Sequence, residues 1–201
     1  MKERIVNILR EEAEAISKIP VNDAYSEAID LLFEHIHKRN GKLIASGMGK
    51  AGQIAFGIAT TFSSTGTPAV FLHPSDSQHG DLGVMQENDV FLLISNSGKT
   101  REILELHTLS RNLFENIPVI VITGNPDSPL GEVADVVLST GNPREVCPLD
   151  LTPTTSTSVM AVIGDVLVVL MMEKIGFTKE EYAKRHHGGY LGYKSRLGAA
   201  K

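Results

Sequence analysis

The spacing of apolar residues along this chain changes near residue 41, and this change divides the sequence into two regions with different hydrophobic patterns. Before that point they recur every three or four residues, which is the spacing of amphipathic helices. One such stripe ends at Pro20, and a second, from Ile29 to Ile36, ends at Gly41. We therefore predict two helices within residues 1–40. The first stripe consists of Ile5, Ile8, Leu9, Ala13 and Ile16.

Beyond residue 41, short and continuous apolar runs alternate with longer helical stretches. Runs of this kind, separated by helices, are typical of a parallel sheet that is covered on both faces. We predict one α/β domain over residues 1–201, with a doubly wound, three-layer core at 41–176 and a C-terminal helix and tail at 177–201. The predicted strands are 42–46, 69–72, 90–94, 119–123 and 136–139. The predicted helices are 51–64, 100–113, a short one near 129–133, and a long one from about 154 to 175.

Composition and charge narrow the class of protein further. A chain of 201 residues argues for a single domain, and a net charge of −5 argues against a basic nucleic-acid-binding surface. The single cysteine excludes an intrachain disulfide and fits a reducing cytoplasm. The N-terminus is charged throughout, and the longest apolar stretch, 159–172, contains Asp165 and is too short to cross a bilayer. We expect a cytoplasmic protein without nucleic-acid or membrane partners.

The loop after the first predicted strand has the spacing G-x-G-x-x-G over residues 47–52. A dinucleotide site would need an acidic residue about 20 positions later, but the nearest one, Asp76, lies beyond a proline. A P-loop is excluded as well, since Ala51 replaces the required serine or threonine. A plain tight turn that needs Gly47 and Gly49 is one explanation. Lys50 at the start of a helix favours the other, an anionic ligand.

Hydroxyl groups crowd the loop after the third predicted strand. Ser95, Asn96, Ser97 and Thr100 surround Gly98 where the following helix begins. Hydroxyls and free helix N–H groups together suit a phosphate, whereas a helix cap alone would need only one hydroxyl. The loop has neither a Walker lysine nor a metal-binding aspartate, which favours a phosphorylated metabolite over a nucleoside triphosphate.

Several motifs follow one another in a fixed order between residues 47 and 192. They are GMGKAG, FLHPSDSQHGDLG, SNSGKT, ITGNPDSPL, REVCPLDLTPTTSTSVMAVIGD and HHGGYLG. As a set they resemble the sugar isomerase (SIS) domain family, and within it the arabinose-5-phosphate isomerases. The resemblance implies a flavodoxin-type strand order and the interconversion of D-ribulose 5-phosphate and D-arabinose 5-phosphate through an enediol. It also implies a place in 3-deoxy-D-manno-octulosonate synthesis for lipopolysaccharide or capsule. Since aldose–ketose interconversion moves a proton and needs no redox cofactor, we expect no cofactor and no metal.

The resemblance assigns roles to particular residues. Glu145 would be the base that moves the proton, and His186 would open the sugar ring. Lys50 would lie beside the sugar oxygens or the phosphate, while Glu102 and His79 would be supporting or alternative acid–base groups. The residues expected to contact substrate are Gly47, Gly49, Ser95, Asn96, Ser97, Thr100 and Thr154. Related domains form dimers and tetramers in which a histidine reaches a neighbouring site, so a homo-oligomer, a tetramer, with shared sites is expected here.

Several of these positions have a simpler explanation. Glu102 falls in the first turn of a helix, where an acid is favourable whatever the function. Glu145, between two prolines, has no helical role in the sequence, which strengthens its functional interpretation. His187 competes with His186 for the catalytic position, and Cys147 fits a small packed residue better than a nucleophile. The histidines show no metal-ligand spacing.

Two further functions stay open from the sequence. One is a phosphosugar-binding module without catalysis, and the other is an isomerase of a different sugar phosphate, such as 3-hexulose 6-phosphate. Many relatives continue into paired cystathionine-β-synthase-type domains, so we expect regulation through such domains to be absent in this chain.

Overall fold

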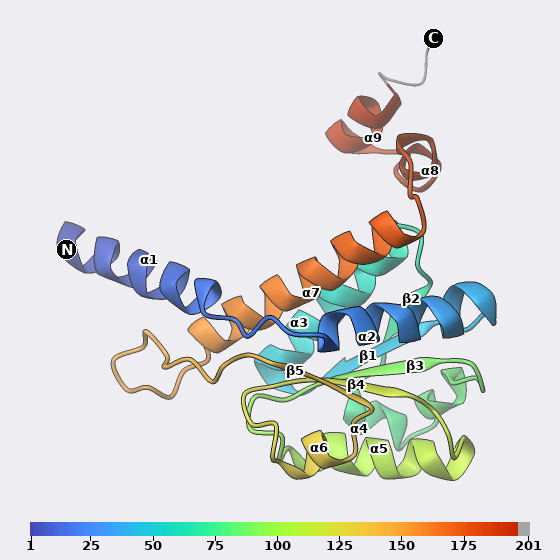
Figure 1. The fold of residues 1–201 in the computed structure, drawn as a ribbon, viewed down its shortest axis with the longest axis horizontal. Coiled ribbons are helices and arrows are strands. Elements are labelled where there is room, and N and C mark those ends of the chain that lie inside the picture. Colours follow the sequence, from blue (N-terminus) through green and yellow to red (C-terminus); the bar gives the residue numbers. More distant parts are fainter. Residues whose placement is uncertain (197–201) are drawn as a thin grey trace.

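A computed structural model describes residues 1–196 and contains a five-stranded, all-parallel sheet at its centre (Figure 1). The strand order β2-β1-β3-β4-β5 is the flavodoxin-type order, so the predicted fold class is confirmed. The inner strands are buried along their whole length, as expected for apolar runs covered on both faces. The strands are β1 (Leu43–Gly47), β2 (Ala69–Phe71), β3 (Val90–Ile94), β4 (Val119–Thr123) and β5 (Val136–Ser139).

Helices cover the two faces of the sheet and create two separate cores. On one face α2, α3 and α7 pack around residues such as Ala28, Phe62 and Ile163. On the other face α5 and α6 pack through Ile103 and Leu130. Figure 1 shows these helices as layers on opposite sides of the strands. The helices are α1 (Lys2–Ser17), α2 (Ala24–Leu32), α3 (Gly49–Ser64), α4 (Pro74–Ser77), α5 (Arg101–Leu113), α6 (Pro129–Glu132), α7 (Thr155–Lys174), α8 (Lys179–Arg185) and α9 (Gly189–Arg196), with a π-helix η1 (Phe33–Lys38) and a 3₁₀ turn η2 (Asp81–Val84).

The long helix α7 corrects one argument made from the sequence. It has 20 residues, and by length and composition alone it could cross a membrane, since its most apolar window has a mean hydropathy of 1.9. The length argument against a membrane span was therefore wrong. Half of that window is nevertheless buried inside the domain, where Val159, Ile163 and Leu167 belong to the main core. Asp165 lies on the exposed side of the helix.

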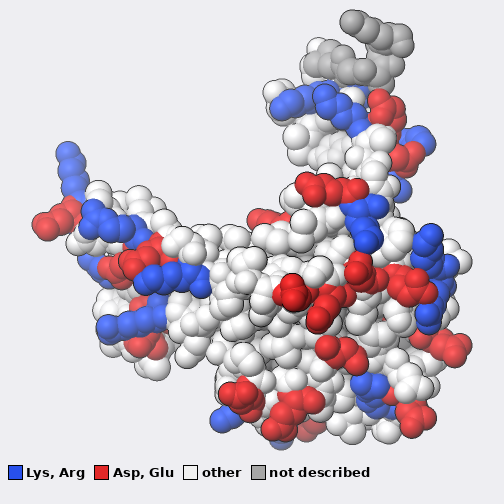
Figure 2. Space-filling view, in the orientation of Figure 1, with Lys and Arg blue, Asp and Glu red and all other residues white. Residues whose placement is uncertain are grey.

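The N-terminal helix α1 lies apart from the layers and extends beyond the sheet (Figure 1). None of its residues is buried, and Ile5 and Leu9 of the predicted apolar stripe are 49% and 65% exposed. Only its C-terminal end, around Ala15 and Ile16, packs against the core. Figure 2 shows side chains of both charge signs along this helix. The stripe predicted the helix correctly but not its exposure.

The C-terminal part holds two short helices where one helix and a tail were predicted. α8 and α9 pack against each other beyond the end of α7, on the side of the molecule away from α1 (Figure 1). His186 ends α8, and its backbone carbonyl lies so close to Gly192 that a Cβ there would come within 2.3 Å. Residues 197–201 of the predicted tail lie outside the described residues.

Candidate functional site

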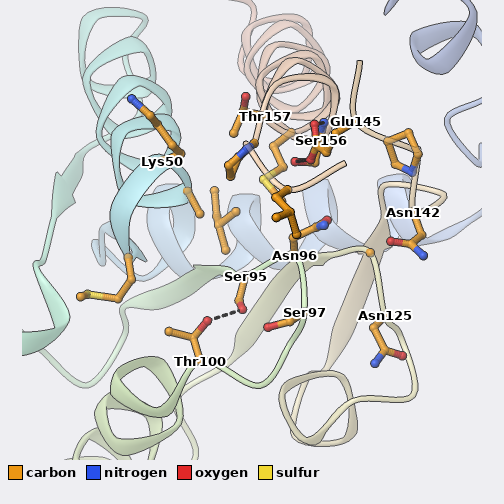
Figure 3. Close-up of a pocket in the computed structure, with 18 of the residues that line it drawn as sticks. Lys50, Ser95, Asn96, Ser97, Thr100, Asn125, Asn142, Glu145, Ser156 and Thr157 are labelled. Atoms are coloured by element: carbon orange, nitrogen blue, oxygen red, sulfur yellow. Dashed lines mark hydrogen bonds between the residues drawn. The ribbon is translucent and has the colours of Figure 1, made fainter. Parts of the chain in front are cut away.

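Loops from four strands meet at the carboxyl edge of the sheet and, with the start of α7, enclose a cavity of about 950 Å³ (Figure 3). This is the edge where ligands bind in open α/β sheets. The residues that line the cavity include Met48 and Lys50 after β1, Ser95, Asn96, Ser97 and Thr100 after β3, Asn125 after β4, Asn142 and Glu145 after β5, and Ser156 and Thr157 of α7.

The loop after β3 forms one wall of the cavity. The hydroxyls of Ser95 and Thr100 are hydrogen-bonded to each other at 2.8 Å, and the Ser97 Oγ accepts the N–H of Lys99 at 3.2 Å. Thr100 occupies the N-cap position of α5 but makes no side-chain cap, so the simple capping explanation of this loop is wrong. Gly98 has a φ of +62°, and a Cβ there would lie 1.8 Å from the Ser128 Oγ. Only glycine fits this turn, which presents three hydroxyls at the start of a helix.

A buried acceptor lies beside this wall. The Oδ1 of Asn96 is buried and accepts no hydrogen bond from any residue within 1–196. A Cβ at Gly124 would come within 2.7 Å of this oxygen, so the absence of a side chain there leaves room for it beside the loop after β4. A buried acceptor without a partner is costly unless a ligand supplies the donor, and a sugar hydroxyl is such a donor.

Two asparagines in the cavity were not predicted from the sequence. Asn125 and Asn142 stand in matching T-G-N-P segments, which directly follow β4 and β5. In both turns the asparagine N–H bonds to the hydroxyl of the threonine two residues before it, at 3.1 Å and 3.3 Å. The signal was therefore present as a repeated motif at two strand ends, although nothing in either copy alone pointed to a ligand.

Glu145 lies opposite the β3 loop, at the N-terminal end of α7 (Figure 3). Its Oε2 accepts the N–H of Thr154 at 2.7 Å, the Thr154 hydroxyl at 2.9 Å and the N–H of Ser156 at 3.3 Å. Its Oε1 accepts the Ser156 hydroxyl. The carboxylate thus binds the free N–H groups at the start of α7, so the statement that Glu145 has no helical role was wrong.

These contacts also set the charge state of the carboxylate. Burial raises the pKa of Glu145, but the four hydrogen bonds from Ser156 and Thr154 outweigh it and bring the pKa below its ordinary value of 4.5. Glu145 is therefore ionised at neutral pH and carries a negative charge into the cavity.

Two residues further on, hydrogen bonds from Thr152 and from the N–H groups of Leu151 and Leu149 lower the pKa of the Cys147 thiol to about 6.

The loop after β1 contributes a cation. Lys50 is exposed at the start of α3, and its side chain lies on the same cavity as Ser95 and Glu145 (Figure 3). Gly49 has a φ of +56°, and a Cβ at Gly47 would lie 2.8 Å from the backbone of Ala51. Both glycines are needed for the turn itself, and they line a small neighbouring hollow of about 350 Å³ instead of the main cavity.

The remaining predicted residues do not line the cavity. Thr154 contributes through its bonds to Glu145, and Glu102 lies half-buried in the first turn of α5. His79 is exposed after α4. His186 lies at the far end of α7, where its ring stacks on Tyr182 with 3.7 Å between ring centres and its Nδ1 lies 3.0 Å from the Tyr182 carbonyl. Within residues 1–196 no three histidine, cysteine or acidic side chains are grouped as metal ligands.

Comparison with known proteins identifies the family. The SIS domain model matches residues 35–170, and the chain belongs to the SIS domain family. Among curated proteins, the arabinose 5-phosphate isomerases KdsD of Yersinia pestis and Pseudomonas aeruginosa are 42% and 44% identical to it over 192 and 172 residues. These alignments cover 94% and 86% of this chain. The chain spans only about half the length of these relatives, 57% and 51%.

Solved structures agree with the family assignment. A Bacteroides fragilis protein, described as a candidate phosphosugar isomerase involved in capsule formation, superposes with a TM-score of 0.93 at 65% identity, covering 94% of this chain and 99% of that one. An Escherichia coli CFT073 protein in complex with arabinose 5-phosphate superposes with a TM-score of 0.84 at 32% identity, covering 90% and 95% of the two chains.

Proposed function

We propose that this chain is an arabinose-5-phosphate isomerase, which interconverts D-ribulose 5-phosphate and D-arabinose 5-phosphate. The observation that carries the proposal is one cavity with a hydroxyl-rich helix start on one wall and the ionised Glu145 on the other. The KdsD relatives and the Escherichia coli structure with bound arabinose 5-phosphate support the choice of sugar. Because the chain spans about half of the KdsD proteins, the activity is inferred for this domain itself.

In this proposal the loop after β3 holds the phosphate. The Ser97 hydroxyl and one hydroxyl of the bonded Ser95–Thr100 pair donate to phosphate oxygens, and the start of α5 adds its free N–H groups. Lys50 supplies positive charge beside the sugar oxygens, where the enediolate develops negative charge. Asn96 accepts a hydrogen bond from a sugar hydroxyl.

Glu145 acts as the base in this scheme. A carboxylate has about four lone-pair sites, and the Oε1 of Glu145 accepts only one hydrogen bond from the described residues. Its free site takes the proton from C2 of the aldose while the C1 carbonyl oxygen gains a proton, which gives the enediol. Loss of the O2 proton and return of a proton to C1 then give the ketose. The two sugars are isomers, so the reaction needs no external oxidant or reductant, and the proposal includes no cofactor and no metal.

Ring opening falls to His186 of a neighbouring chain. In its own chain this histidine lies at the other end of α7 from Glu145, so we propose a homo-oligomer, a tetramer, in which each site combines groups from two chains. His79 and Glu102 stay supporting groups in the proposal. The product would feed 3-deoxy-D-manno-octulosonate synthesis for lipopolysaccharide or capsule, in the cytoplasm.

The test follows one proton. The purified protein is incubated with ribulose 5-phosphate in D₂O, and NMR follows the appearance of arabinose 5-phosphate and deuterium at C2. Turnover that persists with a chelator and without nicotinamide supports the proposal. If this activity is absent while 3-hexulose 6-phosphate is isomerised, the sugar has been misassigned.

A second candidate function is a phosphosugar-binding module without catalysis. The observation that favours it is the capping role of Glu145, which gives this carboxylate a structural reason to be present. The same NMR experiment separates the two functions, because a binding module would show saturable binding of arabinose 5-phosphate and no exchange at C2.

A further inference from the structure

The exposed helix α1 reaches the loop that carries Glu145. Residues 1–34 lie outside the range matched by the SIS domain model. Nevertheless, Arg4 of this helix bonds to the loop that carries Glu145, and Glu12 bonds to Thr155, which itself bonds to that loop. The Nη2 of Arg4 donates to the carbonyl of Val146 at 3.1 Å. The hydroxyl of Thr155 donates to the Oε1 of Glu12 at 2.9 Å and accepts the N–H of Val146 at 3.1 Å.

The bond to Glu12 determines how the Thr155 hydroxyl is oriented. A hydroxyl has a single proton, and here that proton is donated to Glu12, which leaves a lone pair facing the N–H of Val146. Thr155 is only 1% exposed, so water does not compete for these positions. The Oε2 of Glu12 is itself buried and has no partner within the part of the chain that the structure describes. By contrast, Arg4 is half exposed, and a surface contact of this kind contributes little.

The bonded N–H belongs to the peptide unit that begins at Glu145. A peptide unit is planar, so fixing the N–H of Val146 also fixes the carbonyl side of Glu145. The preceding peptide is held as well, because the N–H of Glu145 donates to the Oδ1 of Asp150 at 2.8 Å. Both peptide units around the carboxylate are thus anchored, one of them through α1.

We infer that Glu12 is a positioning residue for Glu145, acting through the hydroxyl of Thr155 and the peptide between Glu145 and Val146. The inference rests on the proposed role of Glu145 as the base. It gives α1 a function that its exposure does not suggest, since the helix adds no buried residue to the core. Contacts of this kind hold a reacting group in a fixed position. Such positioning matters for catalysis, because a misplacement of about 1 Å can lower the rate about 100-fold.

The test compares three variants with a matched control. Glu12→Ala removes the acceptor, Glu12→Gln keeps an amide oxygen in its place, and Thr155→Val removes the hydroxyl while keeping the shape of the side chain. The control is Glu14→Ala, which removes a carboxylate of the same helix that, among residues 1–196, bonds only to the exposed Lys18. We expect Glu12→Ala to lower kcat about tenfold with KM nearly unchanged, and Glu12→Gln to restore most of it.

Two further measurements separate positioning from general damage to the fold. The double variant Glu12→Ala/Thr155→Val should be no slower than Thr155→Val alone, since both changes remove the same connection. Amide hydrogen exchange at Val146 should accelerate in Glu12→Ala and stay at the wild-type rate in Glu14→Ala. A Glu12→Ala enzyme with wild-type kcat and unchanged exchange at Val146 would overturn the inference, and so would equal losses in Glu12→Gln and Glu12→Ala.

Failure of the proposed function gives a different result. A wild-type protein that isomerises neither ribulose 5-phosphate nor 3-hexulose 6-phosphate refutes the role of Glu145 as base, and with it the catalytic part of this inference. The exchange rate at Val146 still decides whether Glu12 holds the loop. Should Thr155→Val fail to fold, the pair Glu12→Ala and Glu12→Gln decides the question without it.

Discussion

The two ends of α7 carry very different arrangements of polar groups. At the N-terminal end, Glu145 accepts four hydrogen bonds from Thr154 and Ser156 on the wall of a large cavity. Beyond the C-terminal end, His186 stacks on Tyr182 and is not among the residues that line this cavity. α7 has 20 residues, so at a rise of 1.5 Å per residue the two ends lie about 30 Å apart.

This separation shows what one chain can and cannot do by itself. In the proposed mechanism, phosphate binding and proton transfer need only the loops around the cavity, which a single domain supplies. The proposed ring opening by His186 would need a second chain, because no rearrangement of side chains bridges about 30 Å. The cavity at the N-terminal end of α7 is thus formed within one domain. We expect His186, beyond the C-terminal end, to contribute to the site of a neighbouring chain.

The largest effect on activity should come from a substitution of Glu145 at the N-terminal end of α7. Glu145→Gln keeps an oxygen that can accept hydrogen bonds but removes the negative charge that takes the C2 proton in the proposed mechanism. We expect kcat to fall by about 10²–10⁴, the usual contribution of a general base. The control is Glu173→Gln, an exposed acid near the other end of the same helix. Steady-state kinetics with ribulose 5-phosphate provide the measurement, and a Glu145→Gln enzyme with a kcat close to that of the wild type would rule out this residue as the base.

The next largest effect tests whether Glu145 of one chain and His186 of another chain act in the same site. Glu145→Gln and His186→Ala subunits, each expected to have little activity alone, are mixed under conditions that let chains exchange. If each site takes one residue from each of two chains, about a quarter of the sites in a random equimolar mixture regain both groups. Activity of the mixture is compared with that of each variant alone, and native mass spectrometry confirms the exchange. Confirmed exchange without recovery would place both residues in one site of one chain. The same experiment with His187→Ala tests which histidine occupies the position.

Sequence patterns predicted most of the fold because the relevant signals are local. Continuous apolar runs placed three of the five strands at their observed bounds, and the others within a residue. The exposure of α1 could not be predicted in this way, since an apolar stripe looks the same whether it meets a core, a partner chain or solvent. The short helices α4 and α9 were missed because they have too few residues to show a helical period, whereas α8 falls where one C-terminal helix was predicted.

The site was predictable where a loop directly follows a strand. Ser95, Ser97 and Lys50 come together because the carboxyl ends of parallel strands share one edge. The bonds from Thr154 and Ser156 to Glu145 could not be foreseen, since they join a loop to a helix start nine and eleven residues away. The link from Glu12 to Thr155 spans 143 residues and has no signal in either local segment. Tertiary contacts of this kind decide whether a carboxylate is merely present or held in place.

The smallest expected effect is on stability, and it tests whether the Glu145 carboxylate caps the N-terminal end of α7. The folded state lowers the pKa of Glu145 below the ordinary 4.5, so its ionised form stabilises the fold. That contribution is complete above about pH 4.5, where the carboxyl is ionised in the folded and the unfolded chain alike. It is lost as the pH falls through the lowered pKa of the folded state, where the bound carboxylate takes up a proton.

Glu145→Gln should therefore be less stable than the wild type at pH 7 by about 1 kcal/mol, the usual contribution of a helix cap. The difference should shrink as the pH falls below about 4.5, because the wild type then loses the same charge. Urea unfolding at a series of pH values measures both quantities, with Glu173→Gln as the control for removing an exposed acid. A difference that stays constant down to about pH 3 would show that the carboxylate does not cap α7. In that case the loss of kcat in Glu145→Gln would reflect its chemistry alone, without any contribution from a displaced helix end.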